Sequence, residues 1–242
     1  MNEQQTVVIS NRLKCLTEMV TLGNTVADVG CDHGFVSIYL VQNKISPKVI
    51  AMDVRTGPLS KAQEHIALYD LNDYIETRLS DGLTAFSAGE AQTMICAGMG
   101  GKLMQKILSA YVEKSKSFKE LILQPQSELQ EFRYFLRHEG YKIVEENILC
   151  EDGKYYFPMK VIPVGDMQET ELTDNELFDK YGELLLKQKE EGLREYLLYK
   201  QNTLSLIEDE LSKQKKERAQ SRLTEIREEL QEIAMVLEKY FA

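Results

Sequence analysis

The chain has 242 residues, a formal net charge of −10 and a hydrophobic content of 43%. This length is enough for one α/β domain with a buried core and a smaller appendage. No apolar run reaches the roughly 18 residues of a membrane-spanning helix, and the N-terminus lacks the pattern of a secretory signal, so we expect no membrane partner and a cytoplasmic location. Most of the negative charge lies after residue 163. The total charge therefore does not exclude a nucleic-acid partner, whose binding depends on local basic patches.

The four cysteines and three histidines give no pattern of a metal site or a disulfide frame. The cysteines are Cys15, Cys31, Cys96 and Cys150. They form no C-x-x-C pair and lie in or near apolar runs, which is typical of reduced, mostly buried thiols in a cytosolic protein. The histidines lack the spacing of metal ligands, so we predict no metal.

Residues 1–164 alternate strand and helix patterns. Helices are predicted at 11–20, 34–42, 58–69, 102–111 and 127–138. Short apolar runs predict strands at 25–29, 48–53, 75–79, 93–97 and 119–124. Two further strands, 141–149 and 155–164, are joined by an E-D-G-K turn and should form an antiparallel hairpin. Seven strands with this final hairpin are typical of the α/β class I S-adenosylmethionine-dependent methyltransferase fold, a Rossmann-like seven-stranded sheet.

The C-terminal part has no strand pattern after residue 165. Apolar residues recur there at heptad spacing in two stretches, namely Leu193, Leu197, Leu204, Ile207 and Leu211, and Leu223, Ile226, Leu230, Ile233, Leu237 and Tyr240. The polar stretch 212–221 lies between them. We predict two long helices packed as an antiparallel coiled-coil hairpin, and a chain divided into domains 1–164 and 165–242.

The stretch T-V-A-D-V-G-C-D-H-G at 25–34 predicts a strand, a glycine turn and a helix N-terminus. Such a turn brings a nucleotide close to backbone N–H groups, although an ordinary strand–helix turn has the same pattern. Asp32 occupies the place where the dinucleotide fingerprint has its second glycine. Because a carboxylate repels a pyrophosphate, an NAD-dependent dehydrogenase is disfavoured. S-adenosylmethionine, a cationic cofactor without phosphates, suits the loop better.

Loops after the next three strands complete the predicted cofactor site. Asp53 ends the second strand, where an acidic residue accepts hydrogen bonds from ribose hydroxyls. Asp81 and Gly82 follow the third strand, beside the expected adenine pocket. The A-G-M-G-G loop follows the fourth strand and leaves open space beside cofactor and acceptor. The predicted cofactor-binding residues are Asp28, Gly30, Cys31, Asp53, Val54, Asp81, Gly82, Ala97, Gly98 and Met99.

Asp32 is the candidate catalytic residue. It lies in the first-strand turn, where the transferable methyl group is expected. A carboxylate there either accepts the proton that the acceptor loses or stabilises the cation electrostatically. His33 either orients Asp32 or is a plain turn residue.

Five motifs occur in order along the chain: D-V-G-C-D-H-G, A-M-D-V, S-D-G-L, A-G-M-G-G-K-L and L-I-L-Q-P-Q, followed by the long C-terminal helices. With them the chain resembles the bacterial tRNA (adenine-22-N1)-methyltransferase family (TrmK), through the whole catalytic domain and the helical appendage. The resemblance implies S-adenosyl-L-methionine as donor, a tRNA acceptor, methylation of N1 of an adenine in the D-loop region, and Asp32 as the catalytic acidic residue. No obligate protein partner is evident.

Several polar residues outside the cofactor loops are candidates for tRNA contact: Asn11, Arg12, Gln124, Lys213, Lys215, Lys216 and Arg218. Gln124 ends the fifth strand, where its amide either meets a base edge or caps the next helix. The last four residues lie at the predicted tip of the helical hairpin, where a solvated loop explains them equally well.

The A-G-M-G-G loop agrees with chemistry at a ring nitrogen, because many amino-methylating enzymes carry N/D-P-P-Y after the fourth strand. Loss of a proton from the adjacent amino group to Asp32 would raise the reactivity of N1. Two other classes stay open: a methyltransferase acting on a small molecule or protein, with the helices as a dimerisation or docking device, and an idle nucleoside-binding scaffold. Methyl transfer to RNA would distinguish the main reading from both.

Overall fold

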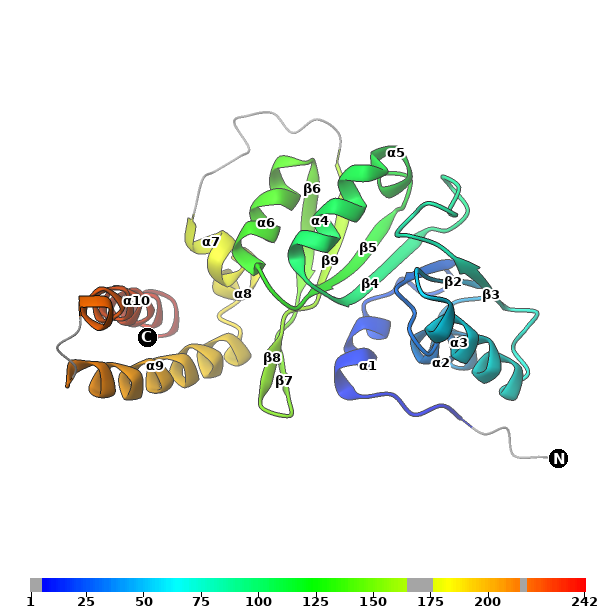
Figure 1. Cartoon of the computed structure of the whole chain (residues 1–242). Coiled ribbons are helices and arrows are strands. Elements are labelled where there is room, and N and C mark those ends of the chain that lie inside the picture. Colours follow the sequence, from blue (N-terminus) through cyan, green and yellow to red (C-terminus); the bar gives the residue numbers. More distant parts are fainter. Residues whose placement is uncertain (1–5, 165–175, 214–216) are drawn as a thin grey trace. The chain divides into compact units, whose positions relative to one another are not determined.

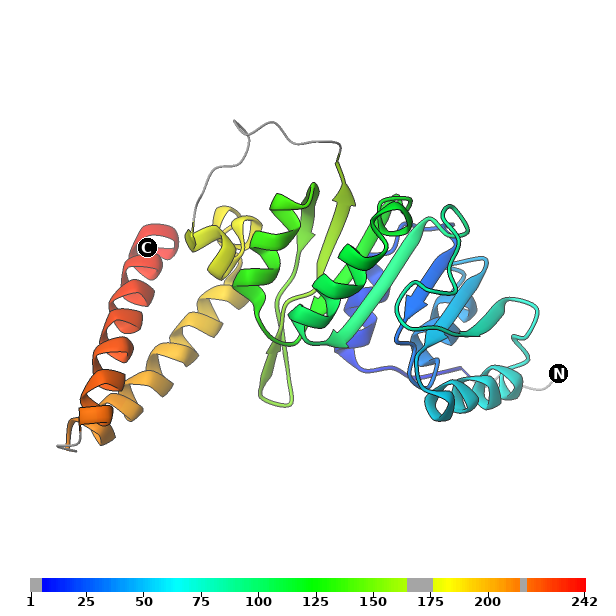
Figure 2. The same cartoon turned by 45° about the horizontal axis from the view of Figure 1, so that its top comes forward.

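The computed structural model describes residues 6–164, 176–213 and 217–242. They form two compact units, Met1–Lys180 and Tyr181–Ala242. The first unit is a seven-stranded sheet with helices on both faces, and the second unit is helical (Figures 1 and 2).

The sheet has the strand order β3-β2-β1-β4-β5-β9-β6. Its strands are β1 (Val26–Val29), β2 (Val49–Asp53), β3 (Ile75–Leu79), β4 (Thr93–Met99), β5 (Glu120–Pro125), β6 (Tyr141–Glu146) and β9 (Met159–Pro163). Strands β1 to β5 pair in parallel, whereas β9 is antiparallel to both of its neighbours, β5 and β6. The order reverses between β1 and β4, and in open α/β sheets ligands bind at such a switch point, outside the carboxyl ends of the strands.

Alternate residues of the buried strands point into two separate cores, as the period of two along a strand requires. Ala27 and Val29 belong to the core beneath α4 (Gly101–Ala110) and α6 (Leu129–His138). The short helix α5 (Val112–Ser115) lies between α4 and α6 in the sequence. Val26 belongs to the opposite core, beneath α1 (Asn11–Glu18), α2 (Phe35–Gln42) and α3 (Thr56–Leu68). The short apolar runs of the sequence are therefore strands covered on both faces.

The predicted final hairpin is antiparallel, but each of its strands is divided in two. β6 and β9 pair within the main sheet, whereas β7 (Leu149–Glu151) and β8 (Lys154–Tyr156) form a separate two-stranded ribbon. Pro158 lies at the division, where its carbonyl oxygen accepts from the backbone N–H of Asn147 (2.9 Å). Because proline has no N–H to donate, it interrupts the ladder. β6 runs parallel to β5, so the ribbon projects beyond the carboxyl edge of the sheet, beside α1 (Figure 1).

The helical unit contains two long helices, α9 (Glu191–Ser212) and α10 (Glu217–Phe241), after the short α7 (Glu176–Tyr181), which spans the boundary, and α8 (Glu183–Lys187). The ion pairs Lys200–Glu229 and Glu208–Arg227 step forward along α9 and back along α10, so the two helices are antiparallel. The predicted pair of long helices is confirmed, whereas the supercoil of a coiled coil stays a prediction. Within the described residues, no helix is both long and apolar enough to cross a membrane.

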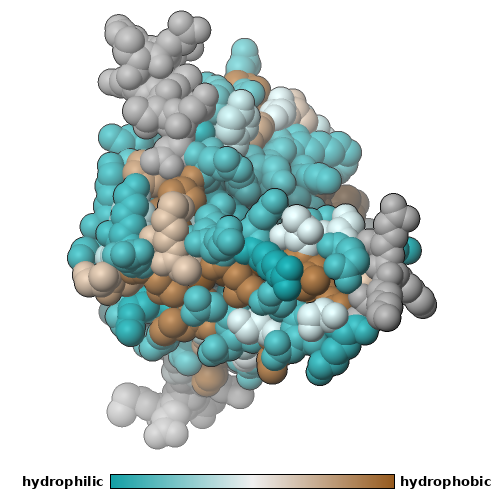
Figure 3. Space-filling model, turned by 90° about the vertical axis from the view of Figure 1, so that its left-hand side faces the viewer, coloured by the Kyte–Doolittle hydropathy of each residue, from teal (hydrophilic) through white to brown (hydrophobic). Residues whose placement is uncertain are grey.

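The buried seam between α9 and α10 differs from the predicted heptads at several positions. Leu197, Leu204 and Ile226 are buried as expected, but Ile207 is 38% exposed and Val236, which the heptads omit, is buried. A step of three residues from Ile233 to Val236 places Leu237 at the edge of the seam. Apolar side chains interrupt the polar surface seen in Figure 3. Among the described residues of the helical unit, the large exposed apolar side chains are those of Tyr199, Leu206, Ile207 and Met235.

The predicted boundary between the two domains follows residue 164. Residues 165–175, which come directly after it, lie outside the described residues. In the structure, residues 176–180 belong to the first unit. Arg137 Nη2 donates to Asp179 Oδ2 (2.6 Å), and the buried Arg133 donates to the backbone oxygens of Asp179 and Lys180 (2.9 and 3.0 Å). These contacts tie Asp179 and Lys180 of α7 to α6. A functional boundary at residue 164 stays a prediction.

Candidate functional site

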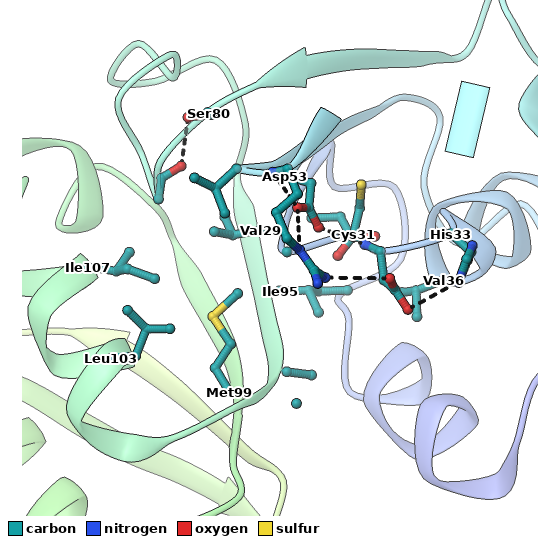
Figure 4. A pocket seen from close by; sticks show the side chains of 18 of the residues that line it. Val29, Cys31, His33, Val36, Asp53, Ser80, Ile95, Met99, Leu103 and Ile107 are labelled. Carbon is teal, nitrogen blue, oxygen red and sulfur yellow. Dashed lines mark hydrogen bonds and ion pairs between the residues drawn. The ribbon is translucent and has the colours of Figure 1, made fainter. Parts of the chain in front are cut away.

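A cleft of about 550 Å³ opens at the carboxyl ends of β1, β2 and β4 (Figure 4). Every predicted cofactor-binding residue lines it, as does Asp32. Met99, Leu103 and Ile107 lie on one side, with Cys31 and Val36 opposite them (Figure 4). The loops meet here because parallel strands end at one edge of the sheet.

The turn after β1 is shaped by Gly30. Its φ of +81° is a conformation that side-chain-bearing residues rarely adopt. The backbone N–H groups of Gly30 and Cys31 both donate to the carbonyl oxygen of Met52 (2.8 and 2.9 Å). A Cβ at Gly30 would lie 2.2 Å from Met99 Cε, so a larger residue would have to displace the Met99 side chain from the cleft wall.

Asp53 joins the turns after β1 and β2. Its side chain is only 5% exposed. Oδ1 accepts from the backbone N–H of Arg55 (2.9 Å), and Oδ2 accepts from the backbone N–H of Asp32 (3.2 Å). Each carboxylate oxygen accepts about two hydrogen bonds. Asp53 thus retains acceptor capacity at the cleft for the hydroxyls of a ligand.

Asp28 is a buried carboxyl group in the floor of the cleft. Burial raises the pKa of Asp28 to about 6. The hydroxyl of Ser37, which donates to Asp28 Oδ2 (2.7 Å), opposes this rise, and the nearby Asp53 adds to it. The folded protein therefore keeps a proton on this group at a pH where the unfolded chain has lost it.

We expect the Asp28→Asn variant to lose part of the pH dependence of stability. As pH rises from about 4 to about 7, ionisation of Asp28 lowers the unfolding free energy of the wild-type protein, because the unfolded chain gives up this proton first. A shift of about two pKa units corresponds to roughly 2–3 kcal/mol. Denaturant titrations of both proteins across this pH range measure the unfolding free energy. Between about pH 4 and about pH 7, that of the variant should rise by this amount relative to that of wild type. A pH-independent difference would contradict the assignment.

Asp32 stands at the rim of the cleft with its side chain 61% exposed. Its carboxylate lies 3.8 Å from His33 Nε2 and 3.9 Å from Arg55 Nη2, so both contacts are loose. Its φ of +49° is a backbone conformation in which Asp and Asn are enriched. The hydrogen bond from the backbone N–H of Asp32 to Asp53 therefore sets the position of residue 32, and its carboxylate is accessible to a ligand.

Two aromatic residues that hold this turn, Phe35 and His65, are not among the residues predicted from the sequence. The ring of His65, from α3, stacks on Phe35 with centroids 4.6 Å apart, and His65 Nδ1 lies 2.9 Å from the carbonyl oxygen of His33. Phe35 also lines the cleft. Residues 33 and 65 are far apart in sequence and show no common periodicity, so no local signal links them.

The predicted tRNA-contact residues occupy different places. Arg12 lines the cleft, and its Nη1 donates to Gln124 Oε1 (2.8 Å). Gln124 is fully buried, and its Nε2 donates to the carbonyl oxygen of Pro125 (3.1 Å). A role of Gln124 in tRNA binding stays a prediction. Asn11 is exposed at the start of α1. Lys213 and Arg218 are exposed beside the junction of α9 and α10, whereas Lys215 and Lys216 lie outside the described residues.

The charges of the cleft suit a cationic ligand. Four carboxyl groups line it, those of Asp28, Asp32, Asp53 and Asp81, against the guanidinium groups of Arg12 and Arg55. This arrangement attracts a sulfonium or ammonium group and disfavours a pyrophosphate. Together with the tight turn at Gly30 and the buried acceptors of Asp53, these residues fit S-adenosylmethionine.

Comparisons with known proteins agree with this geometry. The family model described as a methyltransferase domain matches residues 9–159. The tRNA (adenine(22)-N(1))-methyltransferase of Bacillus subtilis (strain 168) is 37% identical over 148 residues, which cover 61% of this chain and 62% of that enzyme. The solved structure of the B. subtilis m1A22 tRNA methyltransferase TrmK is 29% identical, with a TM-score of 0.79 over 96% of this chain and 99% of that one.

A Streptococcus pneumoniae protein solved in complex with S-adenosyl-L-methionine is also 29% identical, with a TM-score of 0.80 over 95% of this chain and 100% of that chain. The sequence match to the B. subtilis enzyme spans about three-fifths of that enzyme's length. The expected resemblance to bacterial tRNA (adenine-22-N1)-methyltransferases and the expected Rossmann-like fold are both confirmed. With the family model covering well over half of its length, the chain belongs to the methyltransferase-domain family.

Proposed function

We propose that this protein transfers a methyl group from S-adenosyl-L-methionine to N1 of the adenine at position 22, in the D-loop region of tRNA. The observation that carries this proposal is the cleft itself. Buried Asp53 offers acceptors for a nucleoside, and Asp32 stands exposed at the rim beside it. The similarity to the B. subtilis enzyme supports the choice of substrate.

When bound, S-adenosylmethionine supplies an electrophilic methyl group on a sulfonium. The residues of the chain bind and orient the reactants: Asp53 accepts from the hydroxyls, and the loop that follows β4 leaves room for the acceptor base. N1 of adenine is a weak nucleophile. Asp32 accepts a proton from the neighbouring amino group, which raises the electron density on N1 as the new bond forms. A carboxylate that only stabilises positive charge at this point is the alternative role.

The proposed location is the cytoplasm, because all four cysteines, of which Cys15 is half-buried and Cys150 exposed, are free thiols. Burial raises the pKa of the Cys96 thiol to about 12, with a further contribution from Asp28, so the thiol stays protonated at neutral pH. Cys31 is buried as well. Such thiols fit a reducing compartment. The proposed partner is tRNA, and the proposal needs no protein partner.

The proposed function is tested by incubating the protein with methyl-labelled S-adenosylmethionine and unmodified tRNA, then mapping the product nucleoside and its position. We expect 1-methyladenosine at position 22, and no label in a tRNA in which that adenine is replaced by guanine. Label in a small molecule or protein but not in tRNA would favour the second enzyme class. Tight cofactor binding without transfer to any acceptor would favour a nucleoside-binding scaffold.

Charge reversal beside the α9–α10 junction is expected to raise the KM for tRNA by up to about tenfold and to flatten its salt dependence, because phosphate contacts release counterions. The variant is Lys213→Glu with Arg218→Glu, both exposed in the wild-type protein. The matched control reverses Lys142 and Lys239, which changes the net charge equally at other exposed sites. Equal tRNA kinetics for the two variants would mean that the junction is a solvated turn.

A further inference from the structure

The ribbon formed by β7 and β8, residues Leu149–Tyr156, turns one of its faces toward α1. Its register pairs Leu149 with Tyr156 and Glu151 with Lys154, so these four side chains share a face. On that face, Glu151 Oε1 accepts from the backbone N–H of Arg12 (3.2 Å) at the start of α1. Tyr155 belongs to the opposite face. An isolated two-stranded ribbon is marginally stable, so contacts of this kind hold it in place.

The guanidinium of Arg12 is held from two directions. It lies over the ring of Tyr156, 5.2 Å from the centroid, and donates to Gln124 Oε1 (2.8 Å). Gln124 is fully buried at the end of β5, so this anchor is rigid. Arg12 lines the cleft, whereas Tyr156 is not among the lining residues. The ring of Tyr156 also carries the ammonium of Lys154, 5.2 Å from its centroid. Of these two residues, Arg12 and not Tyr156 therefore lies where a ligand in the cleft can reach it.

We propose that Arg12 is the wall of the cleft on which the target base stacks, and that Tyr156 and Gln124 are positioning residues that hold its plane. The inference rests on the proposed function. An enzyme that modifies a base takes it out of its stack, and the unstacked base needs a new planar partner. Guanidinium planes serve this purpose for bases of single-stranded RNA. Planarity, rather than charge alone, is what this arrangement preserves.

The decisive comparison is between Arg12→Lys, which keeps the charge and loses the plane, and wild type. We expect kcat/KM for tRNA to fall roughly 5- to 100-fold in Arg12→Lys, the range for loss of one stacking contact. The affinity for S-adenosylmethionine, measured calorimetrically, should remain that of wild type. Tyr156→Ala should lower kcat/KM for tRNA, and Tyr156→Phe should restore it. Tyr155→Ala, on the opposite face of the ribbon, is the matched control and should change little.

Three results would overturn the inference. Arg12→Lys with wild-type kinetics would mean that the group contacts phosphate through its charge. Tyr156→Phe as damaging as Tyr156→Ala would mean that the hydroxyl, not the ring, matters. An equal loss of cofactor affinity in Arg12→Lys would make Arg12 part of the cofactor wall. Wild-type protein serves as the reference throughout: if it methylates no tRNA, the proposed function fails, whereas active wild type with unaffected variants removes only the inference.

Discussion

Replacing Asp32 is expected to lower kcat for tRNA methylation by about 10²–10⁴-fold, the usual contribution of a positioned proton-transfer group. S-adenosylmethionine should still bind. The Asp32 side chain is 61% exposed and its contacts to His33 and Arg55 are long, so its removal leaves no buried partner unpaired. The bond that shapes the turn runs from the backbone N–H of residue 32 to Asp53 and survives the change.

Asp32→Asn is the sharper variant, because Asn tolerates the positive φ of this position as well as Asp does, whereas Ala adds backbone strain. Single-turnover rates at saturating tRNA, with calorimetric cofactor titrations, separate chemistry from binding. Near-normal turnover of both variants would refute the catalytic role. A loss of cofactor affinity that matches the loss of rate would make Asp32 a binding residue instead.

Asp53→Ala is expected to weaken S-adenosylmethionine binding by about 5- to 150-fold, or roughly 1–3 kcal/mol, the cost of leaving buried polar groups unpaired. The variant loses the acceptors for the ligand and also leaves the backbone N–H groups of Arg55 and Asp32 without their partner. Calorimetric titration of both proteins measures the effect.

Asp81→Ala serves as the control for Asp53→Ala, because it removes a carboxylate from the same cleft at an exposed position and should cost less. NAD is titrated alongside. Tighter binding of NAD than of S-adenosylmethionine by the wild-type protein would contradict the cofactor assignment. Equal losses in the two variants would mean that general negative charge, rather than the buried acceptors of Asp53, holds the cofactor.

The parallel strands and the loops that meet at the cleft could be predicted from local patterns in the sequence. Short, mainly apolar runs marked β1, β2, β4 and β5, because strands covered on both faces have no wholly polar side. The cofactor loops followed from the strands, since the carboxyl ends of parallel strands share one edge. Gly30 and Asp53 were found as turn and strand-end signals, which are local properties of the chain.

The surroundings of Arg12 follow only from the tertiary structure. Arg12 bonds Gln124 and Glu151, which are 112 and 139 residues away, and its guanidinium lies over Tyr156. Likewise, His65 joins the turn at residue 33 by packing on Phe35. The division of the hairpin into sheet and ribbon, and the inward turn of Gln124, depend on how separate elements pack and on strand register. The periodicity of a sequence indicates only which face of its own helix or strand a residue occupies. Contacts between distant elements therefore depend on how those elements pack and cannot be predicted from periodicity.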